Sequence, residues 1–107
     1  MSREHAVQRI IQEIKSSDSR VQITGYIKNI VDTDFIILND KSDDIKINIK
    51  NVEFIFQKDD LVTVIGELNI NMEGEKEIEA EIIQDKKNLN FDYYLKLYEI
   101  KKELKLV

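Results

Sequence analysis

The chain has 107 residues, 42 % of them apolar, which is enough to bury one hydrophobic core but hardly two. Sixteen Lys and Arg stand against 21 Asp and Glu, so the formal net charge is −5. The absence of cysteine excludes disulfides, thiolate metal sites and Cys nucleophiles, and the single histidine, His5, cannot form a His-rich metal cluster by itself. There is no apolar leader and no run of 18 apolar residues, so we expect a soluble intracellular protein of the cytoplasm or nucleoid.

The first predicted element is an N-terminal helix within residues 1–17. Its apolar residues follow the i, i+3, i+4, i+7 spacing of a one-sided helix: Val7, Ile10, Ile11 and Ile14. Ser2 is available as the N-cap. The polar run at 16–19 then favours a loop, because Ser and Asp side chains compete for backbone hydrogen bonds.

Residues 20–85 predict a β-barrel. Val, Ile and Thr are frequent there, and apolar residues alternate with polar ones. Turn residues separate five strands, which we expect at 20–31, 35–39, 45–49, 61–70 and 76–84. Gly25 lies within the long first strand and permits a sharp bend. Five short antiparallel strands predict a closed OB-fold barrel, since closure removes exposed edges and a β-sandwich usually needs about seven strands.

A C-terminal helix is predicted within residues 88–107. Its apolar residues form two rotated rows, one through 91, 95 and 98 and the other through 97, 100 and 104. A single barrel covers only one row, so we expect the helix to bind a partner subunit or a second copy. The alternative is that both rows pack on the barrel of their own chain. The predicted interface residues are Phe91, Tyr94, Leu97, Tyr98, Lys101 and Leu104.

The order of these stretches also resembles a known family. Val-Gln-Ile-Thr-Gly-Tyr-Ile at 21–27, Phe-Ile-Ile-Leu-Asn-Asp at 35–40, Ile-Lys-Ile-Asn-Ile at 45–49 and Asp-Leu-Val-Thr-Val-Ile-Gly-Glu-Leu at 60–68 precede a Glu-rich last strand and a terminal helix. This is similar to the small and middle subunits of replication protein A, especially the archaeal ones, and to their telomere-capping relatives. Relatives often carry Asp-Gly-Thr-Gly after the second strand, whereas residues 39–43 here contain no Gly. The resemblance implies single-stranded DNA binding by the barrel, subunit assembly by the C-terminal helix, and a role in DNA replication and repair.

The outer faces of the first three predicted strands carry the candidate site. Single-strand binders combine a basic groove along the backbone with aromatic platforms for the bases. We therefore predict that the nucleic-acid-binding residues are Tyr26, Lys28, Phe35, Lys46, Asn48 and Lys50. The lysines would contact phosphate, and the two rings would stack on bases. A solvated polar sheet face explains the same pattern without a ligand, and Phe54 or Phe56 either reaches a base or closes the barrel end.

The charge is divided unevenly along the chain. Residues 1–58 hold nine basic and nine acidic residues, whereas residues 59–85 hold nine acids against Lys76 alone, a net charge of −8. The last hairpin should therefore repel phosphate, and we expect it to point away from a short footprint on the first three strands. Only three of the 16 cations are Arg, which predicts binding with little sequence preference.

No sequence motif indicates catalysis. Nucleotide-binding, zinc-protease and nucleophile-elbow motifs are absent. Asp40, Asp43 and Asp44 lack the Gly and the distal Glu of a calcium loop. We expect a non-catalytic protein without cofactor or metal. Two functions remain open: a subunit that binds single-stranded DNA, with RNA as a weaker option, and a scaffold that assembles through its terminal helix without binding nucleic acid.

Overall fold

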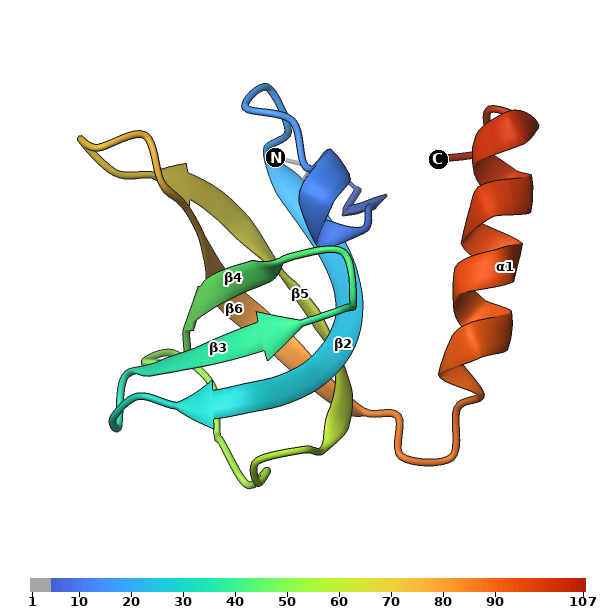
Figure 1. Cartoon of the computed structure of the whole chain (residues 1–107). Helices are drawn as coiled ribbons and strands as arrows, with labels where there is room; N and C mark the ends of the chain where they lie inside the picture. Colours follow the sequence, from blue (N-terminus) through green and yellow to red (C-terminus); the bar gives the residue numbers. More distant parts are fainter. Residues whose placement is uncertain (1–4) are drawn as a thin grey trace.

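The computed structural model describes residues 5–107. The strands are β1 (Val7–Gln8), β2 (Arg20–Ile30), β3 (Phe35–Asn39), β4 (Asp44–Asn48), β5 (Leu61–Ile70) and β6 (Lys76–Asp85). Their order is β1-β2-β3-β4-β6-β5, and β2 also pairs with β5, which closes the five long strands into a barrel. Helix α1 (Phe91–Glu103) follows a loop and lies beside the barrel (Figure 1). The mainly β OB-fold predicted from the sequence is confirmed.

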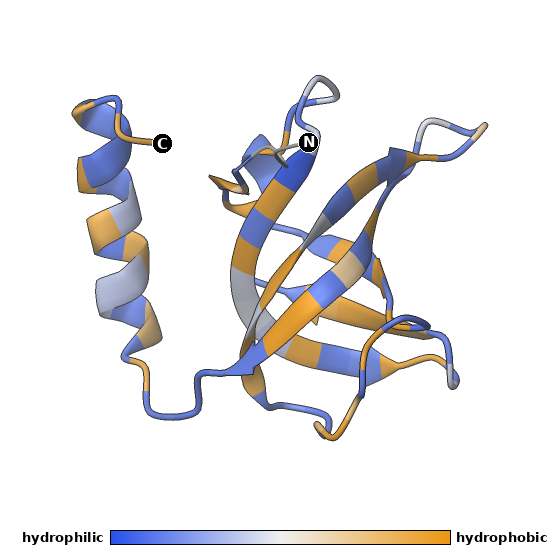
Figure 2. Cartoon of the chain, turned by 180° about the vertical axis from the view of Figure 1, so that it is seen from behind, coloured by the Kyte–Doolittle hydropathy of each residue, from blue (hydrophilic) through white to orange (hydrophobic). Residues whose placement is uncertain are grey.

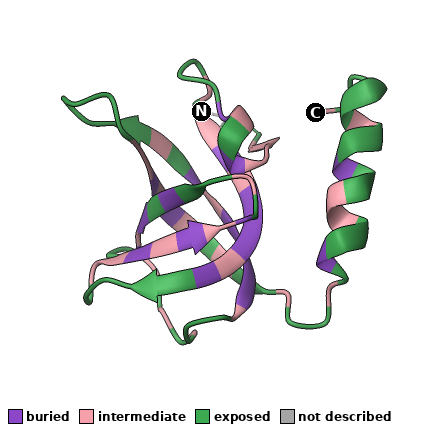
Figure 3. Cartoon of the chain, viewed as in Figure 1, coloured by how far each residue is buried: buried purple, intermediate pink, exposed green. Residues whose placement is uncertain are grey.

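Alternating side chains build the barrel core. The predicted strands agree with the observed ones to within one residue at each end. Ile36 and Leu38 of β3 point inward and are buried, as are Ile45 and Ile47 of β4 (Figure 3). The residues that alternate with them therefore point outward, among them the half-buried Ile37 of β3 and the exposed Lys46 of β4, and the candidate site lies on this outer face.

Gly25 allows the long strand β2 to bend into the barrel. A Cβ at this position would lie 2.6 Å from the backbone oxygen of Asn39 on β3. Real side chains do not approach a backbone oxygen so closely, so only glycine fits here. The bend brings the second half of β2 onto β3, while the first half pairs with β5.

The predicted N-terminal helix is wrong. Among the described residues this segment contains the short strand β1, which pairs in parallel with β2, and one 3-10 turn, η1 (Ile11–Glu13). The backbone N–H of Arg9 donates to Gln22 at 3.1 Å, and that of Ile11 donates to the Asp40 carboxylate at 2.7 Å. These tertiary bonds hold the segment extended, so its apolar residues serve the barrel without a helix. The expected cap, Ser2, lies outside the described residues.

The long loop between β4 and β5 closes one end of the barrel. Phe54 and Phe56 are partly buried and pack against the core, with their ring centroids 5.8 Å apart in an edge-to-face arrangement. Figure 2 shows this loop at the end of the barrel, with hydrophobic and hydrophilic residues along it. Of the two alternatives for these rings, the structure supports closure of the barrel. No helix within residues 5–107 has the length and hydrophobicity needed to span a bilayer.

Candidate nucleic-acid interface

The outer face of the β3–β4 hairpin brings together four of the six predicted site residues. Phe35 opens β3 and lies directly opposite Asn48 of β4, and Ile37 lies opposite Lys46. Lys50 follows β4, and its backbone N–H donates to the Asn48 side chain at 2.9 Å. We call Phe35, Lys46, Asn48 and Lys50 the Phe35 platform.

Two ammonium groups lie over the Phe35 ring. The Lys46 Nζ is 4.2 Å from the ring centroid, and the Lys50 Nζ is 5.5 Å from it. Both distances fall in the range of a cation–π contact. Within residues 5–107 neither lysine forms an ion pair with a carboxylate, so both ammonium groups are free to turn toward a ligand. The platform therefore combines an aromatic face with two free cations.

Lys28 and Tyr26 are held elsewhere. The Lys28 Nζ lies 2.7 Å from the Asp44 carboxylate, which compensates its charge. This hydrogen bond lowers the pKa of Asp44 from its ordinary value, with a second contribution from Asn39. Tyr26 packs edge-to-face against Phe91 of α1, with their ring centroids 5.3 Å apart.

The predicted residues therefore form two groups and no single surface. Tyr26 pairs with Asn39, four residues along β3 from Phe35, which corresponds to about 13 Å. Of these two groups, the Phe35 platform is the one that combines an aromatic ring with cations that have no ion-pair partner within residues 5–107.

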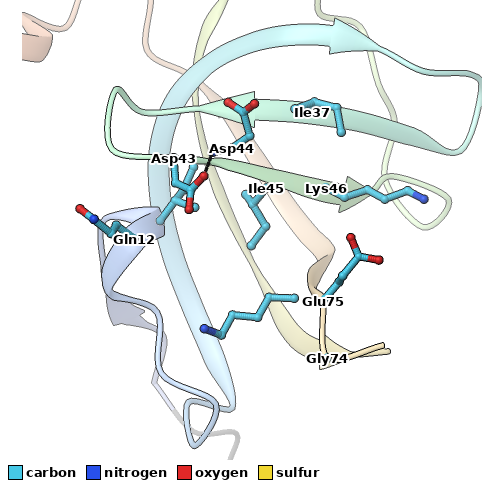
Figure 4. A pocket seen from close by; sticks show the side chains of 10 residues that line it. Gln12, Ile37, Asp43, Asp44, Ile45, Lys46, Gly74 and Glu75 are labelled. Carbon is cyan, nitrogen blue, oxygen red and sulfur yellow. Dashed lines mark hydrogen bonds between the residues drawn. The ribbon is translucent and has the colours of Figure 1, made fainter. Parts of the chain in front are cut away.

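The tip of the last hairpin lies on the same side as Lys46. Gly74, Glu75 and Lys76 line a pocket of about 480 Å³ together with Asp44 and Lys46 (Figure 4). The expectation that this hairpin points away from the candidate face is therefore wrong for its tip. The barrel causes this, because β6 pairs in parallel with β4 and brings the start of β6 beside the platform.

The turn between β3 and β4 contains a residue whose role the sequence did not reveal. Asp40 is buried, and its carboxylate accepts hydrogen bonds from the backbone N–H groups of Ile11 and Ser42, at 2.7 and 3.0 Å. Asp40 thus ties the N-terminal segment to the hairpin that carries the platform. The sequence indicated a turn at Asn39-Asp40, but it did not reveal that Asp40 would bind the backbone of the distant Ile11.

No group of His, Asp and Glu within the described part of the chain is arranged to hold a metal ion.

Helix α1 packs on its own chain through one side. Asn90 caps it, since its side chain accepts from the Tyr93 backbone N–H. Phe91 and Tyr98 are 4 % and 1 % exposed. The Tyr98 hydroxyl donates to Glu13 at 2.8 Å, and Gln8 donates to the Tyr94 hydroxyl at 3.0 Å. We call Phe91, Tyr94, Tyr98 and Lys101 the inner seam of α1; Lys101 donates to Gln8 at 3.3 Å.

The other apolar row of α1 is exposed. Its members lie at i, i+4, i+7 and i+11 and share one face of the helix. They are Tyr93 (63 % exposed), Leu97 (37 %), Ile100 (51 %) and Leu104 (63 %). We call them the outer row. Four of the six predicted interface residues thus belong to the inner seam, and Leu97 and Leu104 belong to the outer row.

No model of a protein family matches the sequence, and no curated protein matches it. Solved structures do match in fold. A chain of the S. pombe Stn1–Ten1 complex superposes with a TM-score of 0.79 at 14 % identity, over 95 % of this chain and 96 % of that chain.

Two further solved structures have the same fold. The telomere capping protein Ten1 from S. pombe gives a TM-score of 0.75 at 14 % identity, over 92 % of this chain and 99 % of that one. The hypothetical protein YgiW from E. coli gives 0.63 at 21 % identity, over 76 % and 91 %. These likenesses show that the chain has the OB-fold architecture found in telomere-capping proteins.

Proposed function

We propose that the chain is a non-catalytic OB-fold subunit of a replication-protein-A-like complex, which binds single-stranded DNA at the Phe35 platform with little sequence preference. One observation carries this proposal: the half-buried Phe35 lies on the outer face of the sheet with two ammonium groups at 4.2 and 5.5 Å from its ring centroid, neither of them in an ion pair within residues 5–107. A base can stack on the ring while Lys46 and Lys50 turn to the flanking phosphates. Lysine provides point charges without the bidentate fork that reads guanine, so the contact is tolerant of sequence.

Assembly is the second part of the proposal. The outer row of α1 is a contiguous apolar stripe on a helix whose opposite side already holds the barrel. Exposed stripes of this kind mark protein–protein interfaces. The structural likeness to a chain of the Stn1–Ten1 complex supports a subunit role. The role in DNA replication or repair that we include in the proposal rests on the resemblance of the sequence to subunits of replication protein A.

Fluorescence anisotropy with a labelled oligo-dT at low salt tests DNA binding. Phe35→Ala should weaken binding about tenfold, because base–aromatic stacking contributes about 1–3 kcal/mol per base. Tyr93→Ala is the matched control, since Tyr93 is an exposed aromatic residue on α1 away from the platform. Salt-insensitive or absent binding by the wild-type chain would overturn the proposal, and an oligo-U competitor would reveal a preference for RNA.

The contribution of the lysine charges to DNA binding can be measured separately, from the salt dependence of the binding constant. For single strands the logarithm of the binding constant falls with the logarithm of salt concentration by about 0.7 per phosphate neutralised. Lys46→Gln should therefore reduce that slope by about 0.7. Lys96→Gln on the exposed side of α1 should leave it unchanged. An unchanged slope for Lys46→Gln would remove Lys46 from the site.

A scaffold without nucleic-acid binding is the second candidate. It is favoured by the ion pair that compensates Lys28 with Asp44, and by the acidic hairpin tip beside Lys46. Lys46→Glu separates the two functions. It should abolish oligo-dT binding if the chain is a DNA-binding subunit, and it should leave assembly unchanged if the chain is a scaffold.

A further inference from the structure

Strand β6 places two carboxylates immediately beside the Phe35 platform. The parallel pairing of β4 with β6 sets Lys46 beside Glu77 and Asn48 beside Glu79. Ile78 and Ala80 of β6 are buried, so the glutamates between and before them face outward, on the same side as Lys46. Neighbouring strands are about 4.8 Å apart, so the surface changes from basic to acidic within one strand spacing.

Part of this acidic edge is unfavourable for the sheet itself. Glu79 also lies directly opposite Glu67 in the β5–β6 ladder. Like charges in opposed positions destabilise a sheet. Within residues 5–107 neither Glu77 nor Glu79 forms an ion pair, and Glu79 only accepts a hydrogen bond from Asn51 at 2.8 Å. Neither carboxylate is therefore held in an ion pair, and both can act on a ligand that approaches the platform.

We propose that Glu77 and Glu79 restrict the platform to single-stranded nucleic acid by repelling the second strand of a duplex; this inference rests on the proposed function. A single strand can follow β3 and β4 without crossing β6. A duplex carries two phosphates per 3.4 Å of its axis, and its backbones are separated by grooves about 6 and 12 Å wide. When a duplex places one backbone on Lys46 and Lys50 and extends toward β6, its other backbone lies beyond these carboxylates by roughly the groove width, a distance over which they still repel its phosphates at low salt.

The flank of the platform beyond Phe35 is acidic too. The loop between β2 and β3 contains Asp32 and Asp34, and the Asp32 carboxylate accepts hydrogen bonds from the backbone N–H groups of Asp34 and Phe35, at 2.8 and 3.0 Å. A duplex turned toward this side also meets negative charge. The β6 carboxylates are the better test, because Asp32 shapes its own turn and they do not.

The experiment compares binding of a labelled oligo-dT and of a labelled duplex of the same length at low salt, for the wild-type chain and for Glu77→Gln/Glu79→Gln. Glutamine keeps the size of the side chain and the oxygen that accepts from Asn51. The matched control is Glu99→Gln/Glu103→Gln, which removes two exposed carboxylates from α1. Thermal melting of all three proteins checks the fold. The double β6 variant should melt close to the wild type, because it loses both the repulsion between Glu67 and Glu79 and the attraction between Lys46 and Glu77.

We expect the duplex affinity of the β6 variant to rise more than its oligo-dT affinity, so that the preference for single strands falls about fivefold or more, while the control keeps the wild-type preference. A wild-type chain that binds oligo-dT and a β6 variant with an unchanged preference would overturn this inference and leave the proposed function intact. A wild-type chain that binds neither probe would overturn the proposed function, and this inference with it.

Discussion

The two sides of helix α1 both carry large apolar side chains, but their surroundings differ. On the inner seam, Phe91 and Tyr98 are almost fully buried, and the polar ends of the seam residues have partners on the N-terminal segment. On the outer row, Leu97 and Ile100 remain exposed to solvent. The difference shows that the barrel holds the helix through a few long side chains, and that the rest of its apolar surface is left for another contact.

Hydrogen-bonding capacity decides which side faces the barrel. The seam lies against a segment rich in polar groups, where the Tyr98 hydroxyl reaches Glu13 and the Lys102 ammonium reaches the same carboxylate at 2.6 Å. A tyrosine can bury its ring there and still satisfy its hydroxyl. Leu97, Ile100 and Leu104 have no polar atoms in their side chains, so that row would leave Glu13 without a donor. An apolar partner surface suits the outer row better than this segment does.

Tyr98→Ala should produce the largest effect, because it removes the anchor of the inner seam. Truncation of a buried aromatic residue costs about 3–5 kcal/mol, so the free energy of unfolding in urea should fall by about 3 kcal/mol. Tyr98→Phe should cost about 1 kcal/mol, since it keeps the buried ring and loses the hydroxyl that donates to Glu13. Tyr93→Ala on the outer row should change stability by less than about 0.5 kcal/mol. Equal costs for Tyr98→Ala and Tyr93→Ala would erase the distinction between the two sides.

Leu97→Asp/Ile100→Asp should affect association and leave folding intact. The exposed stripe predicts that the wild-type chain self-associates at high concentration, and light scattering should give a mass above the 12.6 kDa of one chain. The variant should remain at the monomer mass with an unchanged urea midpoint. Glu99→Gln/Glu103→Gln, on another face of the same helix, should keep the wild-type mass. A monomeric wild-type chain, or a variant that still associates, would contradict an association role for the outer row.

The sequence predicts the barrel well because each strand carries its own information. Alternation in Ile45-Lys46-Ile47 fixes which face is buried, and Gly74 with its positive φ fits the turn between β5 and β6. The prediction of an N-terminal helix was wrong for the opposite reason. Its helical spacing is a local signal, and the hydrogen bonds from Arg9 to Gln22 and from Ile11 to Asp40 that override it join residues 13 and 29 apart.

Strand alternation predicted only part of the candidate site. Strand alternation placed Phe35, Lys46 and Asn48 on one face, as the register of β3 and β4 has them. It could not show that Asp44 compensates Lys28 or that Phe91 covers Tyr26, because both partners come from other parts of the chain. The two rows of α1 were visible in the sequence, whereas the side facing the barrel depends on Glu13, a residue assigned to a helix that does not form.

The smallest expected effect is the pH dependence of the inner seam. The hydrogen bond from Lys102 is the main cause that holds the pKa of Glu13 below its ordinary value of 4.5, and the hydrogen bond from Tyr98 adds to it. A carboxyl group with a lowered folded-state pKa stabilises the fold fully above its ordinary pKa and loses that contribution as the pH falls through the folded-state value. The urea midpoint of the wild-type chain should therefore fall as the pH drops below the ordinary pKa of Glu13 and through its lower folded-state value.

Glu13→Gln should make that fall shallower without removing it, because the pKa of Asp18 is also lowered, chiefly by the hydrogen bond from Arg9. Above pH 5 the same variant should be less stable than the wild type, since Lys102 loses its charged partner. Glu103→Gln, a carboxylate on the exposed side of α1, should reproduce the wild-type profile. If Glu13→Gln and Glu103→Gln gave the same profile, the polar ends of the inner seam would have no part in holding α1, and the contrast with the outer row would rest on the buried rings of Phe91 and Tyr98 alone.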